Sequence, residues 1–109
     1  FGHLTGKYLC GHATNGRISR WPAFGQRYSK PNVIPATAAY VALAARHGLT
    51  PMQLALGFVH SRWFVSSTLI GASSLAQLKE TLPATQTPIS ADLLAEIDAL
   101  HLQYTNPAP

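Results

Sequence analysis

The chain has 109 residues, enough for one domain at most. Apolar residues make up 47% of it and charged residues only 11%, a composition that excludes intrinsic disorder, which requires low hydrophobicity and high charge. No apolar run is long enough to cross a bilayer as a helix, so no membrane partner is expected. Glycine and proline follow no period and no heptad run appears, which excludes collagen-like and coiled-coil folds.

The net charge of +4 is unevenly distributed along the chain. All eight Lys and Arg residues lie at or before Lys79, and all four carboxylates come after it. A basic segment without acidic residues of its own favours an anionic partner. That partner is nucleic acid, a phosphorylated cofactor, or an acidic surface elsewhere in a larger protein.

The start of the chain and its single cysteine indicate the context of the protein. The chain begins at Phe1 with neither Met nor a signal peptide, so we expect it to be a fragment that packs against a remainder upstream. Cys10 cannot form an internal disulfide, which excludes a disulfide scaffold and favours a reducing compartment. We therefore expect a cytoplasmic protein.

Residues 1–32 are expected to form a Gly-bearing turn followed by a long loop. Glycine and proline punctuate residues 9–32, and no apolar period survives there. Loops of this length are usually functional or mobile. Two helices are then expected within residues 33–62. The first is Ala-rich and stops near Gly48, and the second begins with a Thr50–Gln53 capping box and has Pro51 at its first position.

Residues 64–70 predict a strand, because they are apolar and β-branched and end at Gly71. Two further helices are expected within residues 74–103, one capped by Ser74 and one by Ser90. A single strand has no partner inside this chain, and its apolar character on both faces is typical of a parallel sheet covered by helices. The order helix, strand, helix thus predicts an α/β fold, either a barrel or a doubly wound sheet, whose other strands lie upstream.

The segment from Leu69 to Glu80 carries the stronger local motif. The expected strand ends, Gly71 lets the backbone turn, and Ser73 and Ser74 precede a helix. Free N–H groups at a helix start bind anions, and serine hydroxyls add donors. The same spacing is also typical of a helix cap that holds no ligand, and spacing alone leaves both interpretations open.

A second motif lies at the start of the chain. Gly2, Gly6 and Lys7 suit a close approach of the backbone to a phosphate. The motif is not a Walker A loop, because Tyr8 stands where Ser or Thr would bind magnesium.

Together, the segments 1–8 and 69–80 resemble the aldo-keto reductase family. Residues 1–8 are similar to the loop after the seventh barrel strand, and residues 69–80 to the eighth strand and the adenosine-phosphate-binding helix start. The resemblance covers essentially residues 1–109 and is nearest to the Tas-like and potassium-channel β-subunit-like branch. It implies the C-terminal portion of a single (β/α)8 TIM barrel domain, mostly helical here, with residues 64–70 as its last strand.

The resemblance also implies a cofactor, NADPH, with NADH as the alternative because Ser74 stands where many members have Lys or Arg. Four residues would line the pyrophosphate: Gly2, Leu4, Gly6 and Lys7. A second phosphate contact would come from Arg17, or alternatively Arg20. Gly71 and Ser73 would meet the 2′-phosphate and ribose, while Gln77 and Glu80 would meet the adenosine. Thr81 replaces an Asn that usually binds adenine.

Catalytic residues are not expected in this chain, since the family's tetrad of Asp, Tyr, Lys and His comes from earlier strands. The resemblance implies that the complete protein reduces a small carbonyl substrate, an aldehyde or ketone, to an alcohol by hydride transfer, and that this segment alone is inactive. The five histidines show no metal-ligand spacing, so no metal site is expected.

Two alternatives remain. One is a non-catalytic regulatory subunit of the same fold. The other is a helix-turn-helix module over residues 36–60, set in basic surroundings. A recognition helix must present polar side chains to the bases, whereas this one offers Met52, Leu54 and Phe58. We therefore expect no nucleic-acid partner.

Overall fold

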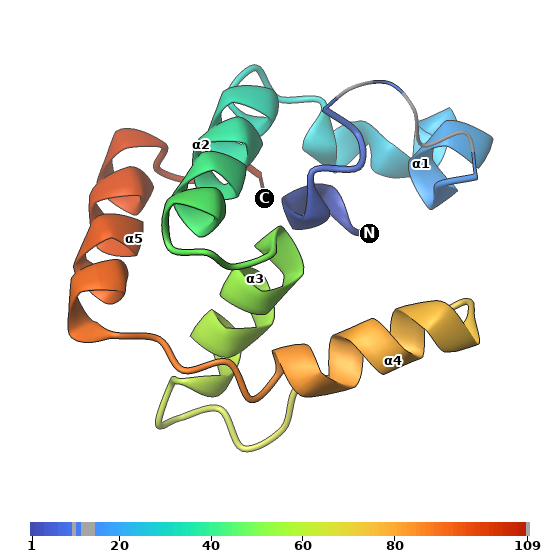
Figure 1. Cartoon of the computed structure of the whole chain (residues 1–109). Coiled ribbons are helices and arrows are strands. Elements are labelled where there is room, and N and C mark those ends of the chain that lie inside the picture. Colours follow the sequence, from blue (N-terminus) through green and yellow to red (C-terminus); the bar gives the residue numbers. More distant parts are fainter. Residues whose placement is uncertain (10, 12–14, 109) are drawn as a thin grey trace.

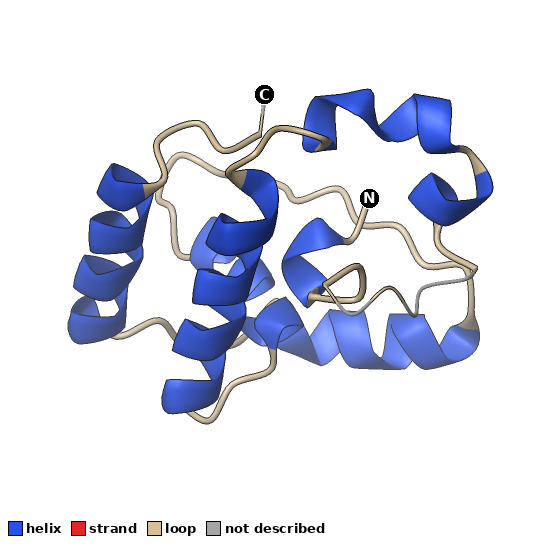
Figure 2. Cartoon of the chain, turned by 90° about the horizontal axis from the view of Figure 1, so that it is seen from above, coloured by secondary structure: helices blue, strands red, loops and turns tan. Residues whose placement is uncertain are grey.

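The computed structural model describes residues 1–9, 11 and 15–108. Within these residues every regular element is a helix, and loops join the helices (Figure 2). The elements are η1 (His3–Thr5), α1 (Arg17–Arg20), η2 (Pro22–Tyr28), α2 (Val33–Arg46), α3 (Pro51–His60), α4 (Leu75–Ala84) and α5 (Ala91–Gln103). None of the helices in this described part is long and apolar enough to span a membrane.

The helix starts follow the local chemistry of the sequence. Before α3, the Thr50 hydroxyl accepts from the Gln53 N–H at 3.1 Å, while the Gln53 side chain accepts from the Thr50 N–H at 2.8 Å. This reciprocal box satisfies two backbone donors that have no partner within the helix. Ser90 caps α5 through its hydroxyl alone, which accepts from the Leu93 N–H at 3.2 Å. The helices expected at these positions are confirmed.

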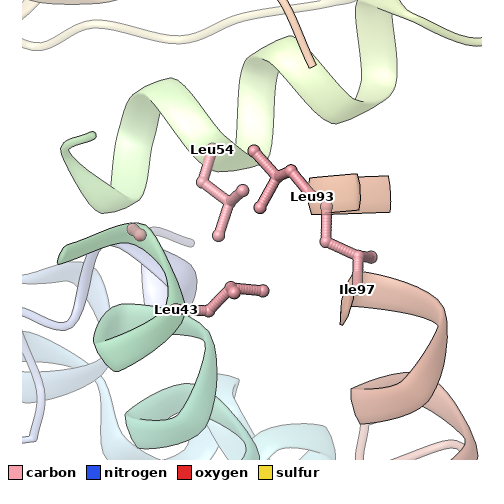
Figure 3. Packing of buried hydrophobic residues seen from close by; sticks show 5 residues of the cluster. Leu43, Leu54, Leu93 and Ile97 are labelled. Carbon is pink, nitrogen blue, oxygen red and sulfur yellow. The ribbon is translucent and has the colours of Figure 1, made fainter. Parts of the chain in front are cut away.

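The core is a cluster between α2, α3 and α5. Leu43 and Ala44 of α2 are fully buried, and Leu54 of α3 and Leu93 and Ile97 of α5 complete the cluster (Figure 3). The side chains from the three helices point toward one another in this view. α2 and α3 are the two central elements, because α2 packs against α3, α5 and η1, while α3 packs against α2, α4 and η1 (Figure 1).

The prediction of a strand over residues 64–70 is wrong for this structure. Residues 65–70 form a loop between α3 and α4, and no strand occurs among the residues that the structure describes. A strand needs the N–H and C=O groups of a neighbouring strand, and the described residues provide none. Phe64 and Leu69 of this segment are 66% and 96% exposed, so apolar side chains that a sheet would bury lie on the surface.

The segment expected to be an irregular loop, residues 9–32, contains two short helices. The Trp21 N–H donates to the Arg17 carbonyl at 2.9 Å, and Pro22 begins η2. Proline suits the first position of a helical turn, where no N–H is required. Cys10 lies outside the described residues. Pro83 lies inside the last turn of α4, which continues to Ala84.

Candidate functional site

The turn around η1 brings a cation onto a glycine. Gly2 and Gly6 flank η1 with φ of +80° and +78°, values that L side chains rarely adopt. The Thr5 hydroxyl donates to the Gly2 carbonyl at 2.7 Å and holds the turn closed. The Lys7 side chain folds back over Gly2 so closely that a Cβ there would lie 2.8 Å from both Cε and Nζ of Lys7. The turn therefore presents backbone and an ammonium group at one place.

Aromatic rings fix this turn against η2. The His3 ring stacks on Tyr28 at 4.3 Å, and the Phe1 ring meets the edges of Phe24 and Tyr28 at 5.2 and 5.6 Å. Burial first, and then nearby positive charge that includes Lys7, lowers the pKa of His3. The His3 Nε2 atom is buried and has no hydrogen-bond partner among the described residues. His3 is therefore a neutral packing residue of the turn.

Arg17 joins the same cluster from a distant part of the sequence. Its guanidinium carbon lies 5.2 Å from the centre of the Phe1 ring, while Lys7 Nζ lies 5.1 Å from the centre of the Tyr8 ring. The Tyr8 hydroxyl donates to the Phe1 carbonyl at 3.3 Å, which links the two aromatic residues. The structure thus gathers Gly2, Lys7 and Arg17 around Phe1. Phe1 is not among the site residues that the sequence predicts.

The start of α4 carries the other group of expected site residues. The Ser74 hydroxyl accepts from the Gln77 N–H at 3.2 Å and caps the helix. The Gln77 Oε1 atom accepts from both the N–H and the hydroxyl of Ser73, at 2.8 and 3.0 Å. The cap expected at Ser74 is therefore present, and the Gln77 side chain bonds Ser73 rather than the Ser74 backbone. All residues from 71 to 80 are exposed, including Gly71 and Glu80.

Thr81 is not available as a ligand. It is only 6% exposed, and its hydroxyl donates to the Gln77 carbonyl at 2.7 Å inside α4. A side chain bound into its own helix and buried cannot turn toward an adenine ring. This agrees with the sequence, in which Thr81 stands where the resemblance to the aldo-keto reductases would place an adenine-binding Asn.

The two groups of site residues belong to separate elements, the turn around η1 and the start of α4. η1 and α4 each pack against α3, and the first turn of α4 lies at the end of that helix farthest from α3 (Figure 1). No hydrogen bond or ion pair joins the two groups within the described residues. The large cavity of about 590 Å³ lies between α2, α3, α5 and η1, and Leu4 is the one expected site residue that lines it.

The donors present fit the oxygens of a phosphorylated cofactor. The described residues contain no group of three His, Cys, Asp or Glu side chains placed to hold a metal. The site residues offer the ammonium group of Lys7 at the turn, and N–H and hydroxyl donors at a helix start. This donor set is the chemistry that phosphate oxygens require.

Comparison with known proteins assigns the family. Residues 2–102 match the model of the aldo/keto reductase family. The chain belongs to the aldo/keto reductase family. This confirms the resemblance carried by residues 1–8 and 69–80, and the family implies that the helices are part of a (β/α)8 barrel.

Individual aldo/keto reductase relatives agree with this assignment. The chain is 48% identical over its whole length to "Protein tas" of Escherichia coli (strain K12) and, to the same degree, to "Protein tas" of Shigella flexneri. It is 35% identical, over 97% of its length, to an "Aldo-keto reductase" of Babesia bovis. The chain spans 32% of the length of the two Tas relatives and 39% of the third.

Proposed function

We propose that this chain forms the NADP(H)-binding C-terminal part of an oxidoreductase that reduces aldehydes or ketones to alcohols. Membership of the aldo/keto reductase family supports this reaction class. The observation that carries the cofactor proposal is the Lys7 ammonium folded over Gly2 in a turn with two left-handed glycines. Such a turn admits a pyrophosphate close to the backbone and neutralises part of its charge.

In this proposal the residues of the chain bind and orient the cofactor. Gly2, Leu4, Gly6 and Lys7 contact the pyrophosphate, and Gly71 and Ser73 contact the 2′-phosphate and ribose. Gln77 and Glu80 contact the adenosine from α4. A phosphate at Ser73 replaces the Gln77 carboxamide, because both accept from the same N–H and hydroxyl. The chemistry that NADPH supplies when bound is a hydride for the carbonyl carbon of the substrate.

In this proposal, the proton donor of the reaction and the other barrel strands belong to the part of the protein outside this chain. The group that protonates the carbonyl oxygen belongs to the tetrad expected upstream, together with the other barrel strands. NADPH is the proposed cofactor, with NADH as the alternative because the first turn of α4 holds no Lys or Arg. A cytoplasmic location remains a proposal based on the single cysteine.

The test is cofactor binding by the full-length protein. Lys7→Gln should raise the Kd of NADPH about tenfold, which is the scale of one charge-assisted hydrogen bond to phosphate. Lys30→Gln is the matched control, since Lys30 is exposed, lies outside the turn and has no role in the proposal. Titration of cofactor fluorescence measures both dissociation constants. Equal values for the two variants would remove Lys7 from the site.

A companion measurement tests the reaction class. The full-length protein should oxidise NADPH when given an aldehyde, and the expected tetrad should be present upstream of Phe1. Cofactor binding without turnover of any aldehyde or ketone would contradict the enzyme proposal and favour a regulatory subunit of the same fold.

A further inference from the structure

Three side chains of the N-terminal region share one face. Arg17 lies in α1, Trp21 joins α1 to η2, and Phe24 lies in η2. The backbone leaves the helical conformation at Trp21, where φ is −133° and ψ is 80°. Two hydrogen bonds still tie the three residues together, because the Trp21 N–H donates to the Arg17 carbonyl at 2.9 Å and the Phe24 N–H donates to the Trp21 carbonyl at 3.0 Å. Together these side chains line a hollow of about 300 Å³.

Phe1 contacts two of the three side chains that line this hollow, Arg17 and Phe24. The Arg17 guanidinium lies over the Phe1 ring at 5.2 Å, and the Phe24 ring meets Phe1 edge to face at 5.2 Å. A contact with a ring uses none of the guanidinium's N–H groups in a hydrogen bond to a carboxylate, so Arg17 retains donors for an anionic ligand. Trp21 and Phe24 are each 58% exposed, so both present ring surface to a ligand.

The charge of the surrounding surface selects the ligand. Residues 1–32 contain five cations and no carboxylate: Lys7, Arg17, Arg20, Arg27 and Lys30. Aromatic walls favour a flat, apolar body, and the guanidinium at one wall favours a carboxylate in the same plane. No acidic residue of this region competes for Arg17.

We propose that Arg17, Trp21 and Phe24 form a binding site for a planar aromatic carboxylate. As a substrate site this inference rests on the proposed function, and it makes the substrate class an aromatic aldehyde or ketone that carries a carboxylate. The assignment gives Arg17 to the substrate anion and replaces the phosphate role expected for it from the family resemblance.

Direct binding tests the hollow without any need for turnover. In the full-length protein, 2-naphthoate measured by titration calorimetry should bind about tenfold more weakly to Arg17→Gln than to the wild type. Arg27→Gln removes the same charge from η2 outside the hollow and should change the affinity little. Trp21→Ala should lower the affinity for 2-naphthoate, and Trp21→Phe should retain most of that affinity. Equal affinities of the Arg17 and Arg27 variants would overturn the site.

Turnover and cofactor binding separate this inference from the proposed function. With 4-carboxybenzaldehyde and benzaldehyde as substrates, Arg17→Gln should lower kcat/KM for the first about tenfold more than for the second and leave the Kd of NADPH unchanged. A loss of NADPH affinity as large as the loss of 2-naphthoate affinity would return Arg17 to the cofactor and overturn the inference. Binding of 2-naphthoate that depends on Arg17, without reduction of either aldehyde, would support the hollow and contradict the proposed function.

Discussion

At the scale of single residues, Glu96 joins two helices through its two carboxylate oxygens. One oxygen accepts from the Arg46 Nη2 and the other contacts the His47 Nε2, at 2.6 and 2.7 Å. The hydrogen bond from Arg46, and then the one with His47, holds the pKa of Glu96 below its ordinary value of 4.5. The folded protein therefore binds this proton less readily than the unfolded chain does.

The sign of the pH effect follows from that lowered pKa. The stabilising contribution of Glu96 is complete above pH 4.5 and is lost as the pH falls through the lowered pKa of the folded state. Glu96→Gln should accordingly lower the melting temperature of the full-length protein at neutral pH, with the difference from wild type shrinking below pH 4.5. Thermal melts of both proteins across this range measure the effect, and a difference that does not change with pH would contradict it.

At the scale of elements, the capping box of α3 is a local device with a measurable value. Thr50→Ala removes the acceptor for the Gln53 N–H and should destabilise the protein by about 1 kcal/mol. Thr50→Ser keeps the hydroxyl and serves as the control, which should lose much less. Urea unfolding of the full-length variants measures both changes. Equal losses for Ala and Ser would show that the methyl group of Thr50, and not its hydroxyl, matters.

Residues 65–70 show how an element depends on its neighbours. Their β-branched and apolar sequence favours a strand, yet in this chain they form a loop without strand partners among the described residues. We expect the amide hydrogens of this segment to exchange rapidly in the isolated chain and slowly in the full-length protein, where upstream strands can accept their hydrogen bonds. Hydrogen-exchange mass spectrometry makes the comparison. Rapid exchange in both would contradict a barrel strand here.

At the scale of the whole molecule, a small core joins α2, α3 and α5. Leu43 is fully buried at its centre, so Leu43→Ala should destabilise the protein by about 2–5 kcal/mol through lost burial and the cavity left behind. Leu43→Met nearly conserves the volume and should cost less than about 1.5 kcal/mol. The two denaturation midpoints decide the matter, and similar losses would mean that the site does not tolerate any change of shape.

The isolated chain should also lack activity. It carries the proposed cofactor residues but none of the tetrad expected upstream, and apolar side chains such as Trp63 and Leu69 lie on its surface. We expect the purified 109-residue chain to reduce no aldehyde under conditions in which the full-length protein does. NADPH consumption by the isolated chain in the presence of an aldehyde would contradict this.

The sequence by itself determined the features whose partners lie within a few residues. The caps at Thr50 and Ser90, the proline that opens α3 and the glycines beside η1 all act on their own turn of backbone, so residue types and spacing were enough to predict them. The family assignment rested on two such local motifs and is confirmed. The closeness of Lys7 to Gly2 belongs to the same short turn.

Only the tertiary structure decided the contacts between residues far apart in the chain. The position of Arg17 over Phe1 and the bonding of Glu96 to Arg46, 50 residues away, depend on how helices pack, which spacing along the sequence does not encode. The strand at 64–70 failed for the same reason. A helix makes its hydrogen bonds within itself, whereas a strand takes them from another segment, and that segment must be present before the strand can form.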